Sequence, residues 1–225
     1  YTQAGTADRF IAVYGDTVRW VKKTNDYFLY NEETGLWEQN DIYAAADKVV
    51  EMSNDIEQAM MQASSDNQAE SIGKYVSNLR KIDYVRASVL FAKTRLKCEI
   101  NDFDANPEII GLPNCKALNV VTGEIMDASP EYMITRRLNG TPKDTVSDQF
   151  KHYIEVFIPE KDVREYFQMY CGSSLVGSML RNASDKKILM IDNAGNTGKS
   201  TFLTALHKAM GDYYTPSKIG ILTEK

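Results

Sequence analysis

The first part of the chain shows short runs of alternating apolar and polar residues. Between residues 16 and 39, apolar positions around Val18 and Trp20 are followed by an aromatic run at 27–30 and by a glycine-containing turn before Leu36. Short runs that are separated by such turns are typical of antiparallel strands. We therefore predict a small antiparallel sheet in this segment.

Apolar residues at three- and four-residue spacing then predict two helices. Asp41 is placed to cap the first helix, and its apolar stripe comprises Ile42, Ala45, Val49, Met52, Ile56 and Met60. The second helix is expected from about Ser71 to Lys97, with a stripe of Val76, Leu79, Ile82, Val85, Val89, Ala92 and Leu96. Because a stripe with this period forms the buried face of an amphipathic helix, we assign the first one to the core.

The polar face of the second predicted helix is open to two interpretations. It carries Arg80, Lys81, Arg86, Lys93, Arg95 and Lys97 against one acidic residue, Asp83. Such a face contacts phosphates in nucleic-acid-binding proteins, but most charged helix faces are only solvated. The nearby aromatic residues, Trp20 and Trp37 among them, leave a similar choice between stacking on bases and packing in the core.

Proline, glycine and asparagine interrupt the chain between Pro107 and Pro142. Short strands at 117–121 and 124–126 flank a Thr-Gly pair, which is typical of a hairpin. Two further helices are predicted at 146–157 and 160–170, the second opening after a proline. We place a domain boundary in this helical stretch.

The most specific pattern lies at residues 186–211, which read KKILMIDNAGNTGKSTFLTALHKAMG. The apolar run at 188–191 predicts a central parallel strand, and the segment after the loop predicts a helix that ends at Gly211. A strand, a glycine-containing loop and a helix in this order form the phosphate loop of nucleotide-binding proteins. The glycines let backbone N–H groups converge on phosphate oxygens at the positive end of the helix.

The candidate nucleotide-binding residues are Asn193, Ala194, Gly195, Asn196, Thr197, Gly198, Lys199, Ser200 and Thr201. Lys199, the candidate catalytic residue, is expected to reach the β- and γ-phosphates of ATP, and Ser200 is expected to bind Mg²⁺ through its hydroxyl. Thr201 is expected to begin the helix and to touch the nucleotide. Asn193 stands where the usual pattern has glycine, and asparagine tolerates positive φ better than most residues.

Composition narrows the class of protein. A hydrophobic fraction of 43% and a charged fraction of 25% are typical of a soluble globular protein. The net charge of -5 argues against coating nucleic acid non-specifically, so any DNA contact must be local. We expect no membrane segment, because no apolar run approaches about 20 residues. Three widely spaced cysteines favour a reducing cytoplasm.

Other reactive side chains have simpler interpretations. His152 and His207 lie far apart in the sequence, which favours packing or exposure over catalysis. Asp102, Asp104 and Glu108 are grouped as in some metal-dependent polymerase sites. They occupy a proline-flanked loop without a strand scaffold, so a metal role is not favoured.

Several short segments resemble one known family, the phage and plasmid primase-helicases related to the poxvirus primase-helicase, whose motors belong to helicase superfamily 3. The similar segments are Thr6-Ala7-Asp8-Arg9-Phe10, Tyr14-Gly15-Asp16, Val18-Arg19-Trp20, Gly35-Leu36-Trp37, Leu112-Pro113-Asn114, Leu118-Asn119-Val120, Thr122-Gly123-Glu124, Tyr170-Cys171-Gly172, Leu175-Val176-Gly177 and Gly211-Asp212-Tyr213-Tyr214. Their order and spacing carry the resemblance. Thr197 and Asn193 depart from it, because the family usually has asparagine and glycine there.

The resemblance implies a ring-forming ATPase, usually a homo-hexamer, that translocates on one DNA strand during replication. It implies an α+β amino-terminal domain at 1–145, a helical connector or oligomerisation segment at 146–180, and the truncated beginning of an α/β P-loop motor, AAA+-like, at 181–225. The family's later acidic, sensor and arginine-finger motifs lie beyond the loop helix. We therefore interpret the chain as an amino-terminal fragment that is inactive by itself.

Two other functions fit the same residues. The chain is alternatively a non-catalytic module that binds DNA or a protein partner, in which case DNA binding survives Lys199→Ala. A nucleotide-dependent kinase or signalling ATPase would instead transfer phosphate to a small acceptor without dependence on DNA.

Overall fold

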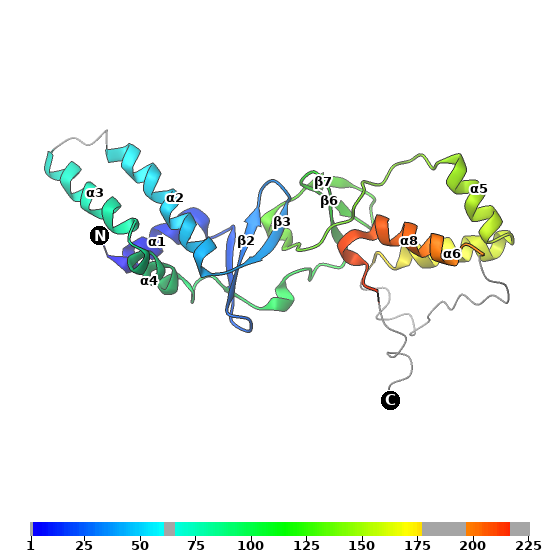
Figure 1. Cartoon of the computed structure of the whole chain (residues 1–225), viewed down its shortest axis with the longest axis horizontal. Helices are drawn as coiled ribbons and strands as arrows, with labels where there is room; N and C mark the ends of the chain where they lie inside the picture. The colour runs from blue at the N-terminus through cyan, green and yellow to red at the C-terminus, as the bar shows by residue number, and fades with distance from the viewer. Residues whose placement is uncertain (1, 61–65, 177–196, 217–225) are drawn as a thin grey trace, which may run out of the picture. The chain divides into compact units, whose positions relative to one another are not determined.

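The computed structural model describes residues 2–60, 66–176 and 197–216 (Figure 1). The chain divides into two compact units. Unit 1 comprises Tyr1–Glu32, Trp37–Phe103 and Ser129–Met133, and unit 2 comprises Glu33–Leu36, Asp104–Ala128 and Ile134–Lys225. Both contain helices and small sheets, so the described residues have the α+β architecture expected of the amino-terminal part.

Unit 1 combines four helices with a four-stranded sheet in the order β3-β2-β1-β4. The helices are α1 (Gln3–Tyr14), α2 (Ile42–Met60), α3 (Asp66–Leu79) and α4 (Ile82–Ala92), and the strands are β1 (Val18–Val21), β2 (Asp26–Asn31), β3 (Leu36–Asn40) and β4 (Lys97–Cys98). Two 3₁₀ turns complete it, η1 (Ile100–Asp102) and η2 (Pro130–Tyr132). Strand β1 pairs antiparallel with β2 and parallel with β4, so the predicted antiparallel sheet is confirmed.

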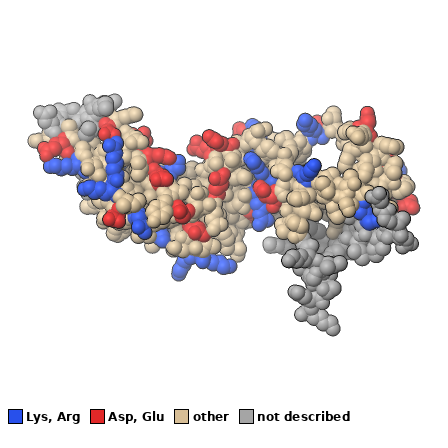
Figure 2. All heavy atoms as spheres, viewed as in Figure 1, with Lys and Arg blue, Asp and Glu red and all other residues tan. Residues whose placement is uncertain are grey.

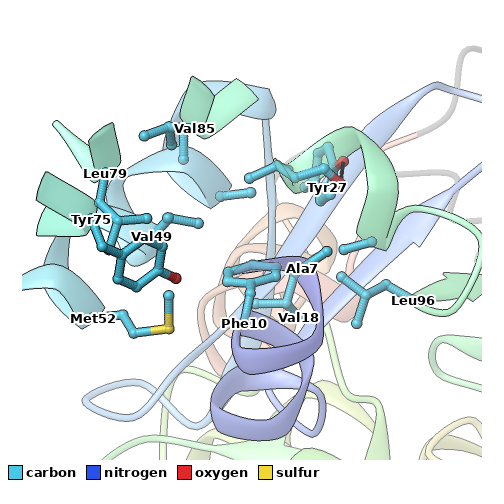
Figure 3. Packing of buried hydrophobic residues seen from close by; sticks show 14 residues of the cluster. Ala7, Phe10, Val18, Tyr27, Val49, Met52, Tyr75, Leu79, Val85 and Leu96 are labelled. Carbon is cyan, nitrogen blue, oxygen red and sulfur yellow. Dashed lines mark hydrogen bonds between the residues drawn. The ribbon is translucent and has the colours of Figure 1, made fainter. Parts of the chain in front are cut away.

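The core of unit 1 brings together side chains from all four helices and from strands β1 and β2. Figure 3 shows Phe10, Val49, Tyr75 and Leu79 pointing toward one another, and each is almost completely buried. Inside this core, the Tyr27 hydroxyl donates to the main-chain carbonyl of Val89 in α4 at 3.2 Å. The α2 stripe belongs to this core as predicted, as far as its side chains are described.

The ends of α2 and α1 show how local chemistry starts each helix. The Asp41 carboxylate accepts from the main-chain N–H groups of Tyr43 and Ala44 at 2.9 and 3.1 Å, which confirms the predicted cap. Helix α1 was not expected from the sequence. It starts in the same way, because the Thr2 hydroxyl accepts from the N–H of Gly5 at 3.1 Å.

The single helix predicted from Ser71 to Lys97 is wrong, because the chain forms α3, α4 and strand β4 there. Lys81 has an extended backbone, with φ -94° and ψ 119°, and it separates the two helices. The break lets α4 pack on both α1 and α2, whereas α3 packs chiefly on α2. Leu79 and Val85 both face the same core, so the apolar period continues across a break that it does not reveal.

Unit 2 contains a three-stranded antiparallel sheet and the last described helices. Its strands are β5 (Ile109–Leu112), β6 (Lys116–Asn119) and β7 (Ile125–Asp127), and its helices are α5 (Asp148–Phe157), α6 (Lys161–Ser173) and α8 (Lys199–Met210), followed by η3 (Gly211–Tyr213). The predicted hairpin and both connector helices are therefore confirmed. The hairpin turns at Gly123, whose φ of +77° favours glycine.

Two further expectations concern the strand before the loop and the absence of a membrane segment. The strand predicted at 188–191 lies outside the described residues. Among the residues that the structure describes, no helix is long and apolar enough to cross a membrane.

Candidate phosphate-binding loop

The structure describes the second half of the predicted phosphate loop. Thr197, Gly198, Lys199, Ser200 and Thr201 are described. Asn193, Ala194, Gly195 and Asn196 lie outside the described residues. The described part of the loop is the junction at which it enters helix α8.

Gly198 has the left-handed conformation that allows the chain to enter α8 directly. Its φ is +92° and its ψ is -4°, and it occupies the position before the first helical residue. Helix α8 begins at Lys199, so the expectation that Thr201 begins the helix is wrong by two residues. Lys199, Ser200 and Thr201 therefore form the first turn, where main-chain N–H groups lack intrahelical acceptors and the helix dipole is positive.

The Lys199 side chain turns back over the loop. Its ammonium donates to the hydroxyl of Thr197 at 2.7 Å; Thr197 is exposed and Lys199 is half-buried. A basic group held beside the positive end of a helix favours an anion at that point. The described residues thus place the lysine charge and the first-turn N–H groups at the same end of α8.

An aromatic support, defined here as Tyr153, Phe157, Phe167 and Phe202, packs beneath this junction. Tyr153 and Phe157 stack in α5 with ring centroids 5.8 Å apart, and Phe157 stacks on Phe202 of α8 at 5.7 Å. Phe167 of α6 lies 5.0 Å from Phe202, which is 8% exposed. Stacked and tilted aromatic pairs of this kind add to the stabilisation from burial.

One hydrogen bond connects the aromatic support to the loop backbone. The Tyr153 hydroxyl donates to the carbonyl oxygen of Gly198 at 2.9 Å, and the same carbonyl accepts from the N–H of Phe202 at 3.0 Å. Burial raises the pKa of Tyr153 above its ordinary value, so its hydroxyl stays protonated and able to donate to a higher pH than that of an exposed tyrosine. A planar peptide whose carbonyl is held in this way also has a fixed N–H direction at Lys199.

The other end of α8 is attached to the sheet of unit 2 through Tyr213. Its hydroxyl donates to the carbonyl of Arg136 at 3.0 Å and accepts from the N–H of Gly111 in β5 at 3.1 Å. Its ring packs against the small core around Ile110 and Leu112. Burial raises the pKa of Tyr213 to about 12.

Gly211 and Asp212 complete this attachment. Asp212 donates its N–H to the carbonyl of Arg137, and its carboxylate accepts from the Arg137 N–H, both at 3.1 Å. Gly211 has φ +53°, and a Cβ atom there would lie 2.6 Å from the Arg137 carbonyl oxygen. We call Gly211, Asp212 and Tyr213 the carboxyl-terminal clamp of α8. Gly211 ends the helix as predicted.

The structure identifies supporting residues that the sequence did not. Tyr153 belongs to none of the motifs described above. Its spacing of four residues from Phe157 is the only local signal, because it places the two rings on one face of a helix. In the sequence, the clamp residues are noted only as one of the segments that resemble the primase-helicase family. Their partners lie about 75 positions or more earlier in the chain, so no local pattern could reveal the contact.

The basic residues predicted to share a single helix face do not lie on one helix, because only Arg86 is in α4, Lys97 is in β4, and the others are in the turns before and after α4. Several have acidic partners, because Arg80 pairs with Glu57, Arg95 with Asp8, and Lys97 with Glu99. Arg86 lies over the ring of Tyr43 at 5.6 Å. The helix break and these contacts exclude one continuous phosphate-facing surface along a helix from 71 to 97.

The tryptophans and tyrosines of the sheet serve mainly in packing. Trp37 is 2% exposed, and its Nε1 donates to the carbonyl of Pro130 at 2.9 Å. Tyr27 is fully buried. Core packing, the favoured interpretation, is therefore confirmed for these two residues. Trp20 is half-buried, and the Lys93 ammonium lies 4.8 Å from the centre of its ring.

The acidic and histidine candidates also have structural contacts. Asp102 accepts from the N–H of Glu99, and Asp104 accepts from the N–H and hydroxyl of Thr135. Within the described ranges, no group of three His, Cys, Asp or Glu residues is placed to hold a metal ion. His207 stacks on Tyr214 with ring centroids 4.4 Å apart, which supports a packing role.

The family comparison concerns the region before the loop. Residues 7–161 match the family described as "D5 N terminal like". A protein of Acanthamoeba polyphaga mimivirus named "Putative helicase" is 27% identical over 131 residues, which cover 56% of this chain and 13% of that protein. The chain therefore spans only a small part of the relative that it matches.

The family match covers well over half of the chain and includes the sheet and helices of unit 1. It also covers the region in which most of the resembling segments lie. The chain therefore belongs to the D5 N terminal like family, as an amino-terminal module of the phage and viral primase-helicase group.

Proposed function

We propose that this chain is the amino-terminal part of an ATP-dependent replicative DNA helicase, in which the loop at 193–201 binds ATP and Mg²⁺. The observation that carries the proposal is the junction at Gly198. A left-handed glycine leads directly into a helix whose first two residues are Lys199 and Ser200. This is the order that phosphate binding at a helix start requires.

The residues of the junction have distinct roles in this proposal. Lys199 neutralises charge on the β- and γ-phosphates, and its ammonium, which bonds to the Thr197 hydroxyl, moves to a phosphate oxygen when the nucleotide binds. Ser200 holds Mg²⁺ through its hydroxyl, and Thr201 contacts the nucleotide from the same turn. Backbone N–H groups of residues 193–198 supply the remaining donors. The metal ion would screen charge on the phosphates.

The support for α8 at both ends gives this junction a defined orientation. Tyr153 holds the Gly198 carbonyl at one end, and Tyr213 joins the other end to strand β5. A binding loop that is oriented before its ligand arrives loses less conformational freedom on binding. The aromatic support and the clamp therefore favour tight phosphate binding without contacting the nucleotide themselves.

We further propose that residues 146–180 contribute to a homo-hexameric ring. Helices α5 and α6 leave large apolar side chains exposed, among them Val156 and Met169, each 67% exposed. Exposed apolar area of this kind is typical of surfaces that become covered in an assembly. In this arrangement, residues 1–145 act as the accessory domain and residues 181–225 begin the motor, which unwinds replicating DNA in the cytoplasm.

The test is DNA-stimulated ATP hydrolysis and duplex unwinding by the complete protein, with Lys199→Ala as the variant. Both activities are expected in the wild type, and both should be lost in the variant. Lys208→Ala is the matched control, because Lys208 lies in the last turn of the same helix and should leave both activities intact.

Other outcomes would change the assignment. ATP hydrolysis without any dependence on DNA would indicate that the motor has another task. The family match ends at residue 161, before the loop, and so it fits equally a module that binds DNA without catalysis. DNA binding that survives Lys199→Ala, together with no ATP binding by the wild type, would establish that second function.

A further inference from the structure

Basic side chains gather at the turn between β1 and β2 in unit 1. Lys22 and Lys23 lie in this turn and are exposed. The Lys93 ammonium, from the end of α4, donates to the Asn25 side-chain oxygen at 2.9 Å and so lies beside the same turn. Figure 2 shows a group of basic side chains where Figure 1 places this turn. We call Lys22, Lys23 and Lys93 the turn patch.

The lysines of the turn patch differ from the basic residues next to them in having no carboxylate partner among the described residues. Arg95 and Lys97 each have a carboxylate partner, whereas the described residues include no ion pair to Lys22, Lys23 or Lys93. The nearest acidic residue along the strand, Asp26, accepts a hydrogen bond from Gln39 at 2.6 Å. Three cations from two elements therefore remain together in a chain whose net charge is -5.

Lys93 is held in a fixed position within this group. Its ammonium lies 4.8 Å from the centre of the Trp20 ring and 6.0 Å from that of Tyr27, in addition to its bond to Asn25. Contacts between a cation and aromatic faces reduce the freedom of a long side chain. Lys93 also follows the last residue of α4, where a positive charge is favoured by the helix dipole.

These features favour a polyanion whose charges are spread along a strand. A single phosphate or carboxylate would engage one ammonium, whereas a nucleic-acid backbone presents a row of charges to all three lysines. The exposed part of the Trp20 ring is limited by Lys93, so base stacking has little room. Recognition would therefore depend on phosphates rather than on sequence.

We propose that the turn patch binds the phosphate backbone of a nucleic acid, and that it is the local DNA contact of this module. The proposal rests on the proposed function only for the identity of the nucleic acid as DNA. It predicts binding that is strong at low salt and independent of base sequence. It also assigns the contact to unit 1 and not to the loop residues.

The experiment uses the full 225-residue chain and fluorescence anisotropy with labelled single-stranded and duplex DNA over a salt series. Lys22→Glu/Lys23→Glu should weaken binding to both DNAs by about 10-fold or more at low salt, because two phosphate contacts become repulsive. The slope of log affinity against log salt should become shallower by about 1 to 2, because fewer phosphate contacts release fewer counterions when the protein binds. Lys93→Gln should weaken binding less.

Lys143→Glu/Lys208→Glu is the matched control, because it makes the same charge change at exposed lysines outside the patch that also have no ion pair among the described residues. It should leave affinity within about 2-fold of the wild type, a small long-range charge effect. Equal loss in both double variants, unchanged binding by Lys22→Glu/Lys23→Glu, or no DNA binding by the wild type would overturn the proposal.

ATP binding measured on the same samples separates this inference from the proposed function. The turn-patch variants should bind ATP as the wild type does. If the wild type binds DNA through the turn patch but does not bind ATP, the inference stands and the ATPase assignment fails. If ATP binds and DNA does not, the inference fails alone.

Discussion

Units 1 and 2 differ in how their helices are stabilised. In unit 1, all four helices contribute buried side chains to one core that also includes strands β1 and β2. In unit 2, α5 and α6 are fully described and contain no buried residue, and α8 buries only Phe202. Among the described residues, unit 1 is therefore held by many apolar contacts in one core, whereas α8 of unit 2 is held by the aromatic support at one end and by the clamp at the other.

This difference has a functional consequence. A core like that of unit 1 stays folded when a single surface residue is substituted, because the stabilisation is spread over many side chains. Helix α8, which carries the candidate phosphate site, is instead held by Tyr153 at one end and by the clamp at the other. Small changes at those contacts are expected to affect the loop while unit 1 stays folded.

The largest expected effect is in the core of unit 1. Leu79→Ala removes a fully buried side chain of α3 from this core and should lower the free energy of unfolding by about 2 to 5 kcal/mol. Both tryptophans of the chain, Trp20 and Trp37, belong to unit 1, so tryptophan fluorescence during urea unfolding reports this unit.

Leu90→Ala is the matched control for that change. Leu90 lies on α4 and is 47% exposed, so the same truncation should cost less than about 1 kcal/mol. Equal losses at the two leucines would mean that unit 1 is not organised around the core described above.

Gly211→Ala should have the next largest effect, and it should be confined to unit 2. The added Cβ would lie 2.6 Å from the Arg137 carbonyl oxygen, and the positive φ of 53° is unfavourable for alanine. The free energy of unfolding of this region should fall by about 2 to 4 kcal/mol, and the loss should be seen as faster amide hydrogen exchange in residues 199–213. Gly140→Ala, which meets no atom within 4 Å, should leave exchange unchanged. Tryptophan fluorescence should show the same unit 1 transition in both variants.

Tyr213→Phe tests the clamp without a steric conflict. The change leaves the Gly111 N–H and the Arg136 carbonyl without their hydroxyl partner. The free energy of unfolding of unit 2 should therefore fall by about 1 to 2 kcal/mol. The measurement is again hydrogen exchange across residues 199–213, compared at several pH values.

The pH dependence follows from the pKa of Tyr213, which burial raises from 10.0 to about 12. Between these values the unfolded chain loses the phenolic proton before the folded chain does, so the stability supplied by the hydroxyl is present below pH 10 and is lost toward pH 12. The advantage of the wild type over Tyr213→Phe should therefore shrink over that range. A constant difference from about pH 8 to pH 12 would contradict the buried position of the hydroxyl.

Local patterns predicted the elements whose signals lie close together in sequence. The cap at Asp41, the turn at Gly123 and the end of α8 at Gly211 all depend on side-chain or glycine chemistry within a few residues. Helix α1 was not predicted, although Ala7, Phe10, Ile11 and Tyr14 have helical spacing and contribute to the core. The sequence does not reveal that Thr6 is also buried, because its hydroxyl is paired with that of Tyr75, 69 residues later, at 2.9 Å.

Contacts between distant segments could not be predicted in this way. The period of the second stripe continues through the break at Lys81 because both helices face one core. At the candidate site, the Lys-Ser pair and Gly198 follow from the motif, but the support by Tyr153 depends on packing between elements 45 residues apart. Periodicity reveals which face of a helix is buried, and it does not reveal what that face meets.

The smallest change in stability, and the most direct link to the loop, is expected for Tyr153→Phe. The rings of Tyr153 and Phe157 can still stack, and the Gly198 carbonyl still accepts from Phe202, so stability should fall by less than about 1 kcal/mol. If Gly198 and Lys199 bind phosphate as proposed, loss of the hydroxyl frees the peptide between them. ATP affinity should then fall by about 3- to 10-fold in calorimetric titrations.

Tyr166→Phe is the control for that measurement, because Tyr166 lies on α6, is 53% exposed and should leave ATP affinity unchanged. Tyr153→Leu should reduce affinity further, since it also removes the ring beneath Gly198, where an added Cβ atom would lie 3.5 Å from the Tyr153 ring. If Tyr153→Phe binds ATP as tightly as the wild type and only Tyr153→Leu is impaired, the aromatic ring supports the loop by packing alone. The hydroxyl would then have no part in orienting the peptide at Lys199, and the two ends of α8 would be held by different kinds of contact.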